Sequence, residues 1–213
     1  MYMEILQEEP EREETVREFS AKALQSLERM QRLIGLLLKI MRLDAGSVRF
    51  ELEDCQVPEL VREAVEELST RAKQEGKRLI VEGDSRDRVR CDPVWTAEAL
   101  SNLVKNVLDH MDRGGTVRVS WLRSPGLFRL QVEDDGCGIL PEDMPHIFKR
   151  FYRSSRDRNS QGIGLGLPFA RAVVEGQGGV LSVNSSPAEG RLSEGKGPSG
   201  GRTVFSISFL SEL

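Results

Sequence analysis

The first regular pattern in the sequence is a long amphipathic helix over residues 11–43. Its apolar residues recur at alternating steps of four and three, which is the seam of a coiled coil. About 33 residues rising ~1.5 Å each make a rod of roughly 50 Å. Residues 1–9 resemble a helix end that Pro10 interrupts, and they would cover only ~13 Å of that rod. We therefore expect the seam to pair with a second chain, and we expect the sequence to be a fragment that lacks most of a preceding helix. Its residues are Ala23, Leu27, Met30, Ile34, Leu37 and Met41.

Past a glycine-containing turn at 44–47, strand-like and helix-like patterns alternate to the end of the chain. Helices with one apolar face are predicted from Pro58, from Pro93 behind an Asp92 cap, and from Gly166. Alternating or β-branched runs predict the strands. These strands are residues 48–52, 78–81, 89–91, 116–122, 128–133, 180–184 and 203–210.

This order of elements predicts an α+β fold, in which a mixed sheet is covered by three helices on one face to form a two-layer α/β sandwich. A long coiled-coil-like helix precedes it, so we place the domains at 1–46 and 47–213. Two polar segments, 153–165 and 185–201, are rich in glycine and serine and are predicted to be mobile loops.

The composition is ordinary for a soluble globular protein, with 38% hydrophobic and 30% charged residues. A net charge of −4 argues against nucleic acid as the main partner. No apolar run approaches the ~18 residues of a membrane span, and no secretory signal opens the sequence. Three widely spaced cysteines favour reduced, cytoplasmic thiols. We expect a cytoplasmic protein whose membrane attachment, as part of a larger sensor, would come from segments upstream of Met1.

Asp134 is predicted to end a strand and is followed by Gly136 and Gly138. A carboxylate in this place can accept the exocyclic amine of adenine, and glycines let a base lie against the backbone. A β-turn is the alternative interpretation, because Asp-Gly is common in hairpins.

A second glycine cluster, formed by Gly162, Gly164 and Gly166, opens a helix. Its backbone N–H groups and the helix N-terminus suit phosphate binding, whereas a flexible hinge is the alternative. No Gly-Lys-Ser/Thr follows, and no strand directly precedes the cluster, so neither a Walker loop nor a dinucleotide fingerprint is present.

Asn102 and Asn106 lie four residues apart and so share one face of their predicted helix. Asn106 offers a neutral oxygen to Mg²⁺, which needs few protein ligands when a triphosphate supplies the others. The alternative is an asparagine on a solvated helix face.

A Phe-x-x-Phe pair, Phe148 and Phe151, lies between the two glycine clusters. Taken in order, the asparagine pair, the Asp-x-Gly-x-Gly run, this pair and the Gly-x-Gly-x-Gly-Leu run resemble the catalytic and ATP-binding domain of sensor histidine kinases. The resemblance covers nearly the whole chain and implies a GHKL-type ATPase fold. Residues 1–43 resemble the end of the first helix and all of the second helix of the dimerisation and phosphotransfer hairpin.

The resemblance implies Mg²⁺ and ATP as cofactors, with Asn106 as the metal ligand and Asp134 as the adenine-binding residue. Phe148 and Phe151 would form the base of a lid, and Arg153 follows where a basic residue approaches phosphate. The full predicted ATP site is Asn102, Lys105, Asn106, Asp134, Gly136, Gly138, Ile139, Phe148, Phe151, Arg153, Gly162, Gly164, Leu165, Gly166, Leu167 and Thr203.

The family's phosphoacceptor motif, His followed by an acidic residue and Arg-Thr-Pro, does not occur in this sequence. It would lie upstream of Met1. His110 and His146 lack its context and are expected to be surface histidines. We therefore expect the chain to bind ATP without completing autophosphorylation, and we assign no catalytic residue.

A second departure is Asp109, which stands where the family often has a lysine that helps to hold the triphosphate. At ~4 Å and an effective dielectric constant near 20, one unit-charge contact is worth up to ~4 kcal/mol before screening. We therefore hypothesise weak ATP binding, with Lys105, Arg150 or Arg153 as partial substitutes.

The implied activity is phosphoryl transfer from Mg·ATP to a histidine on a partner hairpin and then to an aspartate of a response regulator. The implied partners are a second copy of the chain, through the N-terminal helices, and that regulator. One alternative is another ATPase of the gyrase, chaperone or mismatch-repair kind, or a serine kinase acting on anti-sigma partners, against which the long rod argues. The other is a degenerate, non-catalytic interaction module, which Asp109 keeps open.

Overall fold

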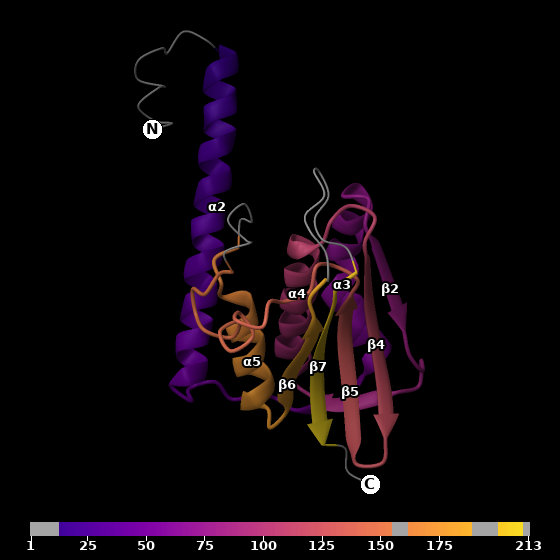
Figure 1. Cartoon of the computed structure of the whole chain (residues 1–213). Helices are drawn as coiled ribbons and strands as arrows, with labels where there is room; N and C mark the ends of the chain where they lie inside the picture. The colour runs from indigo at the N-terminus through magenta and orange to yellow at the C-terminus, as the bar shows by residue number, and fades with distance from the viewer. Residues whose placement is uncertain (1–12, 155–161, 189–199, 211–213) are drawn as a thin grey trace. The chain divides into compact units, whose positions relative to one another are not determined.

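The computed structural model describes residues 13–154, 162–188 and 200–210 of the chain, which divides into two compact units, 1–41 and 42–213 (Figure 1). The described part of the first unit belongs to helix α2 (Glu13–Asp44), which continues into the second unit. The predicted long helix is thus confirmed, while the helix end predicted at 1–9 lies outside the described residues.

The turn after α2 has the left-handed backbone and the capping hydrogen bonds that its glycine predicts. Gly46 takes a left-handed φ of 62°, and its N–H donates to the Leu43 carbonyl at 3.0 Å. The Ser47 N–H donates to the Arg42 carbonyl at 3.1 Å. Two carbonyls at the helix end are thereby satisfied.

A five-stranded sheet in the order β2-β4-β5-β7-β6 forms one layer of the second unit. β2 (Arg78–Glu82) runs parallel to β4 (Thr116–Ser124), and the other neighbours are antiparallel. These are β5 (Leu127–Asp134), β7 (Arg202–Leu210) and β6 (Val180–Ser186). The sheet is therefore mixed, as predicted.

Helices α3 (Val57–Gln74), α4 (Pro93–His110) and α5 (Gly166–Gly176) form the second layer, against one face of the sheet (Figure 1). Alternate residues of β4, β5 and β7 are buried, and the intervening ones are half-buried or exposed. This arrangement confirms the predicted two-layer α+β sandwich, which is preceded by a long helix. Its core includes Leu100, Leu103, Val104, Val117, Val119, Phe128, Leu130, Val132, Phe169, Val173, Phe205 and Ile207.

A second, two-stranded antiparallel sheet pairs β1 (Glu53–Gln56) with β3 (Arg88–Cys91). The strand predicted at 48–52 is wrong, because these residues are irregular and pairing begins only at Glu53. The observed strand β1 is polar and has no apolar alternation of its own, so its partner strand and not its periodicity sets its position.

Residues 48–52 anchor the start of α4 instead of joining a sheet. The Phe50 ring packs edge-on against Trp95, with centroids 5.8 Å apart. The Glu51 N–H donates to Asp92 Oδ2 at 2.9 Å. Asp92 Oδ1 also accepts the Trp95 N–H at 3.2 Å, which confirms the predicted helix cap.

The start of α4 is also bound to the end of α5. Gln177 follows α5, and its Oε1 accepts the Asp92 N–H at 2.6 Å and the Thr96 hydroxyl at 3.3 Å. Its Nε2 donates to the Val173 carbonyl at 3.2 Å.

The hairpin between β4 and β5 is tighter than predicted, with Pro125 and Gly126 as its two turn residues. Its register sets Asp134, the last residue of β5, between Val117 of β4 and Thr203 of β7. Asp134, the residue predicted to bind adenine, therefore lies at the end of the central strand of the sheet.

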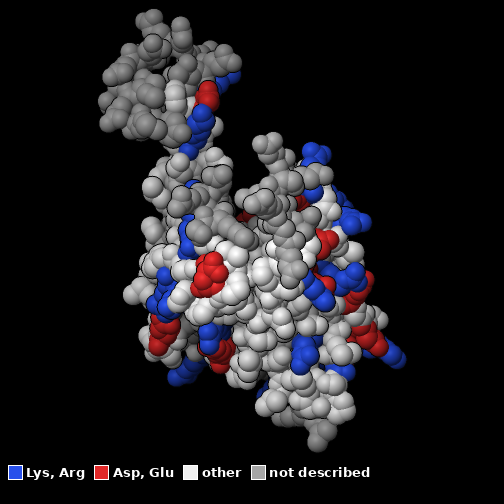
Figure 2. Space-filling model, viewed as in Figure 1, with Lys and Arg blue, Asp and Glu red and all other residues white. Residues whose placement is uncertain are grey.

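The surface of the second unit carries both signs of charge. On the side of the view where β2 and β4 lie, basic and acidic side chains are interspersed (Figure 2). Arg118 and Glu82 form one such pair at 2.6 Å. Within the described ranges, no helix combines the length and the apolar character that crossing a membrane requires.

Candidate functional site

The carboxyl group of Asp134 is buried, with 8% of the residue exposed. Its Oδ1 accepts the Gly136 N–H at 2.8 Å, and the Thr203 hydroxyl also donates to it. Burial raises the pKa of the Asp134 carboxyl, although both of these hydrogen bonds oppose that rise. In such a low-dielectric place, a carboxylate binds a ligand's N–H donor more strongly than it would in water.

A chain of hydrogen bonds continues from Thr203 to the loop after β5. The Oγ atoms of Ser185 and Thr203 are 3.1 Å apart, and Ser185 Oγ accepts the Ile139 N–H at 2.8 Å. Sequence analysis missed Ser185 because it assigned the residue to a loop, whereas β6 extends to Ser186. Asp134, Thr203 and Ile139 from the predicted site therefore belong to one network, joined through Ser185.

The first glycine loop, residues 136–138, requires glycine for steric reasons. Gly138 has a φ of 70°, and a Cβ there would lie 2.3 Å from the Ser186 carbonyl oxygen. A Cβ on Gly201 would lie 2.5 Å from the Cys137 carbonyl carbon. The loop packs with its backbone against the ends of β6 and β7, so it is more than a turn between two strands.

Helix α4 brings Asn102 to the start of α5. Asn102 Oδ1 lies 3.1 Å from the position of a Cβ on Gly166, and Asn102 Nδ2 donates to the Glu98 carbonyl at 2.9 Å. Asn106 is half-buried and Lys105 is exposed, one turn further along α4. The side chain of Asn102 thus adjoins the helix N-terminus that the sequence predicted for phosphates.

The second glycine cluster packs against the segment that carries the phenylalanine pair. Gly164 has a φ of 71°, and a Cβ there would lie 2.4 Å from the Tyr152 carbonyl oxygen. The Gly164 carbonyl accepts the Phe151 N–H at 2.9 Å. Phe151 itself has a φ of 62° and is 59% exposed, whereas Phe148 is half-buried with the Arg171 guanidinium 5.2 Å from its ring centroid.

The remaining predicted residues differ in what they can offer a ligand. Leu165 and Leu167 are buried, so their side chains belong to the core and only their backbone groups could contact phosphate. Gly162 is half-buried and Arg153 is exposed. Most of the predicted loop at 153–165 lies outside the described residues, as does most of the predicted loop at 185–201.

Sequence analysis also missed Asp143, which is 6% exposed and accepts the hydroxyls of Tyr152 and Ser154, each at 2.5 Å. It lies in a Pro-Glu-Asp-Met-Pro run that gives the pattern of a solvated turn. His146, which was expected at the surface, is half-buried. Its ring packs 5.3 Å from that of Tyr152, and its Nδ1 is buried without a hydrogen-bond partner in the described structure. His110 is exposed, as predicted.

Asp109 is not an isolated charge. Its Oδ1 lies 2.7 Å from the Arg71 guanidinium of α3, which also binds Glu75 at 2.6 Å. The repulsion expected from Asp109 is therefore partly neutralised by a cation that the sequence did not suggest. Arg150, one of the expected substitutes, forms an ion pair with Asp44.

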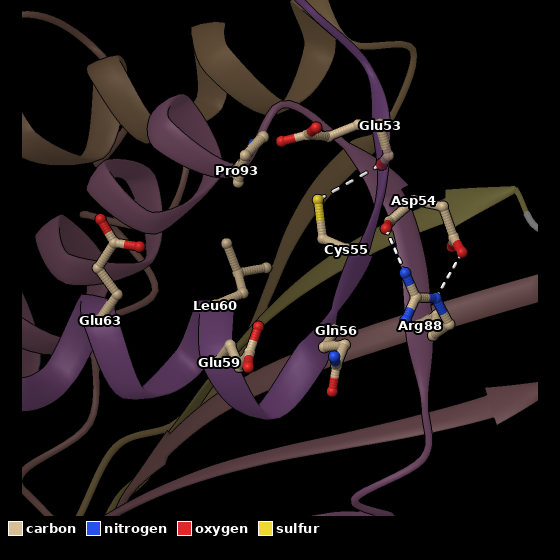
Figure 3. Close-up of a pocket in the computed structure, with 9 residues that line it drawn as sticks. All are labelled: Glu53, Asp54, Cys55, Gln56, Glu59, Leu60, Glu63, Arg88 and Pro93. Atoms are coloured by element: carbon tan, nitrogen blue, oxygen red, sulfur yellow. Dashed lines mark hydrogen bonds and ion pairs between the residues drawn. The ribbon is translucent and has the colours of Figure 1, made fainter.

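A hollow of about 280 Å³ lies beside β1, between the starts of α3 and α4 (Figure 3). Four carboxylates, those of Glu53, Asp54, Glu59 and Glu63, line it, and Arg88 is hydrogen-bonded to Asp54. This charge repels an anionic nucleotide, and none of the predicted ATP-site residues lines the hollow. In the parts of the chain that the structure describes, no cluster of three or more His, Cys, Asp or Glu residues could hold a metal ion.

Residues 91–212 match the family described as histidine kinase-, DNA gyrase B- and HSP90-like ATPase. The sensor-like histidine kinase SenX3 of Mycobacterium tuberculosis is 32% identical over 179 residues, which is 83% of this chain and 44% of that protein. The sensor protein DivL of Caulobacter vibrioides is 34% identical over 190 residues, or 89% of this chain and 24% of that protein. The chain thus spans less than half the length of either relative.

Solved structures share the fold. The Acinetobacter baumannii histidine kinase AdeS matches with a TM-score of 0.71 and 20% identity over 93% of this chain and 84% of that chain. Full-length ShkA, solved in complex with AMPPNP, matches with a TM-score of 0.74 and 21% identity over 92% of this chain and 39% of that chain. A mycobacterial sensor histidine kinase, MprB, is 26% identical with a TM-score of 0.62, over 74% of this chain and 97% of that chain.

The match to the ATPase family covers more than half of this sequence, and it includes the asparagine pair, both glycine clusters and the network around Asp134. Of the two relatives, which match 83% and 89% of this chain, one is named a sensor-like histidine kinase and the other a sensor protein. The chain therefore belongs to the family of histidine kinase-, DNA gyrase B- and HSP90-like ATPases, and it carries the catalytic domain of a sensor histidine kinase.

Proposed function

We propose that residues 47–213 bind Mg·ATP and act within a longer, cytoplasmic kinase portion that phosphorylates a histidine and then a response regulator. The buried Asp134 carboxylate, at the end of the central strand beside a glycine loop, is the observation that carries this proposal. Membership of an ATPase family supports it, and one structural neighbour was solved with AMPPNP.

Asp134 recognises the adenine in this proposal by accepting a hydrogen bond from the exocyclic amine. Thr203 and the Gly136 N–H hold the carboxylate in place. Gly138 lets the loop beside this carboxylate pack directly against the Ser186 backbone, where a Cβ would not fit.

The triphosphate lies in this proposal at the N-terminus of α5, where the backbone of the second glycine cluster offers N–H donors. Asn106 supplies one neutral oxygen to Mg²⁺. Because the described residues contain no acidic cluster for a metal, the triphosphate and water supply the other ligands. Bound Mg²⁺ neutralises phosphate charge, and Lys105 and Arg153 add positive charge.

The chain's own residues act by positioning and charge, and none of them is a nucleophile. Phosphoryl transfer needs the acceptor in line with the γ-phosphate and compensation of the developing charge. Asn102 and Asn106 orient the phosphate end, while Asp134 fixes the base at the other end. The acceptor in this proposal is a histidine of the dimerisation hairpin and not His110 or His146.

The decisive experiment titrates the chain and an Asp134→Asn variant with a fluorescent ATP analogue in the presence of Mg²⁺. The variant should bind at least ~10-fold more weakly, because it turns one acceptor into a donor opposite the amine. Asp135→Asn is the matched control, since Asp135 is exposed and bonds the Thr116 N–H at 2.7 Å. Absence of saturable binding to the parent chain, or equal binding by both variants, would reject the proposal.

We also propose that α2 pairs with a second copy. Leu27, Met30 and Ile34 of the predicted seam are 58–61% exposed. Ile34→Glu should shift the chain from dimer to monomer in sedimentation equilibrium. Arg32→Glu is the control, because Arg32 lies on the opposite side of the helix. A parent chain that is already monomeric would reject the pairing.

The non-catalytic alternative rests on Asp109, so Asp109→Lys tests it directly. If the carboxylate weakens nucleotide binding, the lysine variant should bind Mg·ATP more tightly. No tightening would reject the hypothesis of weak binding at this position, since Arg71 already neutralises part of the charge.

A further inference from the structure

Asp143 is a buried carboxylate without a part in the nucleotide site as described above. Tyr152 donates to its Oδ1 and Ser154 to its Oδ2, each at 2.5 Å. A buried carboxylate is costly unless it is hydrogen-bonded, so both hydroxyls are strongly held at this position. One side chain therefore fixes two points of the chain that are separated by a single residue.

The residue between these two points is Arg153. Arg153 is exposed, while both of its neighbours are half-buried. The hydrogen bonds of Tyr152 and Ser154 to Asp143 hold its backbone on both sides.

The same segment is attached to the second glycine cluster. The Phe151 N–H donates to the Gly164 carbonyl at 2.9 Å, and a Cβ on Gly164 would collide with the Tyr152 carbonyl. The His146 ring packs against that of Tyr152, with centroids 5.3 Å apart. Residues 151–154 are thus held between Asp143 and the loop that leads into α5.

We propose that Asp143 is a positioning residue for phosphate recognition, because it presets the backbone from which Arg153 reaches the triphosphate. This inference rests on the proposed function and adds a residue to it. Asp143 itself does not touch the nucleotide. Its negative charge would by itself repel a triphosphate, so positioning and electrostatics have opposite effects on affinity when the charge is removed.

The test is the nearly isosteric Asp143→Asn variant of the full chain, titrated with Mg·ATP and, by competition, with adenosine. The amide oxygen of this variant can still accept one of the two hydroxyl groups of Tyr152 and Ser154, but the amide nitrogen is a donor and faces the other hydroxyl. We expect a loss of roughly tenfold in Mg·ATP affinity, as for one hydrogen bond to a charged group, and no change for adenosine. Tyr152→Phe and Ser154→Ala each remove one hydrogen bond and keep the carboxylate, so each should give a smaller loss of the same kind.

The Asp143→Asn substitution is also tested in an Arg153→Ala variant, which serves as the matched background. Arg153→Ala alone should weaken Mg·ATP binding, and in its presence Asp143→Asn should cause no additional loss. Unchanged or tighter Mg·ATP binding by Asp143→Asn, an equal loss for adenosine, or full additivity with Arg153→Ala would each overturn the inference. Should Asp143→Asn fail to fold, the Tyr152→Phe variant decides by the same readouts. A parent chain that binds no Mg·ATP would instead reject the proposed function itself.

Discussion

The two glycine loops use the same residue type against different neighbours. Gly138 packs against the backbone at the end of β6, a strand of the five-stranded sheet. Gly164 packs against Tyr152, in an irregular segment where Phe151 is exposed and left-handed. The first loop is therefore fixed by the sheet, whereas the second is fixed by a few hydrogen bonds. One suits recognition of a constant group such as a base, and the other suits a response to a changing one such as a phosphate.

The largest expected effect on stability is that of Gly138→Ala. A left-handed backbone costs ~1–2 kcal/mol for a residue with a Cβ, and this Cβ would also collide with a strand that cannot move. We expect a loss of about 3 kcal/mol or more in the free energy of unfolding, measured with urea. Gly126→Ala is the control, because its φ is 76° but nothing lies within 4 Å of the added atom. Equal losses of stability in Gly138→Ala and Gly126→Ala would show that the first loop shifts to accommodate the added Cβ.

Gly164→Ala should be less destabilising, at about 2 kcal/mol, because the segment 151–154 is held by a few hydrogen bonds and yields more easily than a strand of the sheet. Its effect on Mg·ATP binding should exceed its effect on stability, since the shift displaces Arg153. Urea unfolding and nucleotide titration of one preparation give both values. A loss of stability as large as that of Gly138→Ala would remove the distinction between the loops.

Ser185→Ala sharpens the comparison, because the hydrogen bonds that it removes lie beside the first loop, at Ile139, Arg202 and Thr203. The Ile139 N–H would lose its acceptor at 2.8 Å, which costs on the order of 1–2 kcal/mol. Ser182→Ala, at an exposed position of the same strand, should have almost no effect in the same unfolding assay. Indistinguishable variants would mean that water replaces the hydroxyl.

The smallest effect is the pH dependence contributed by Asp134. Burial raises the pKa of its carboxyl in the folded state, so the folded chain binds that proton more tightly than the unfolded chain does. This tighter proton binding stabilises the folded chain at pH values below the ordinary aspartate pKa of about 3.9. The stabilisation is lost as pH rises through the pKa that Asp134 has in the folded state. Asp134→Asn should therefore unfold at a slightly higher temperature than the parent at neutral pH. The difference should vanish in acid, and parallel curves of Tm against pH would contradict this.

The elements that sequence analysis predicted correctly depend on neighbours in the sequence. The long helix α2, the Asp92 cap and the alternating strands of the β4–β5 hairpin are all local patterns. The order of the motifs was also visible, because it is a property of the chain and needs no coordinates.

The features that sequence analysis missed depend on residues far apart in the chain. β1 is polar and forms only because β3 pairs with it. Ser185 gains its role from Ile139, 46 positions away, and Asp109 is neutralised by Arg71 on another helix. Asp143 lies in a run typical of a solvated turn, yet it is buried and accepts the hydroxyls of Tyr152 and Ser154. No local pattern encodes these partners.

Helix α5 is fastened to α4 at both of its ends. Gln177 is hydrogen-bonded to Asp92 and Thr96 at the start of α4. Gly166 contacts Asn102, which lies ten residues or ~15 Å beyond Asp92 along α4. A ligand that displaces the start of α5 towards α4 would therefore press on Asn102, while Gln177 keeps the far end of α5 bound to the first turn of α4.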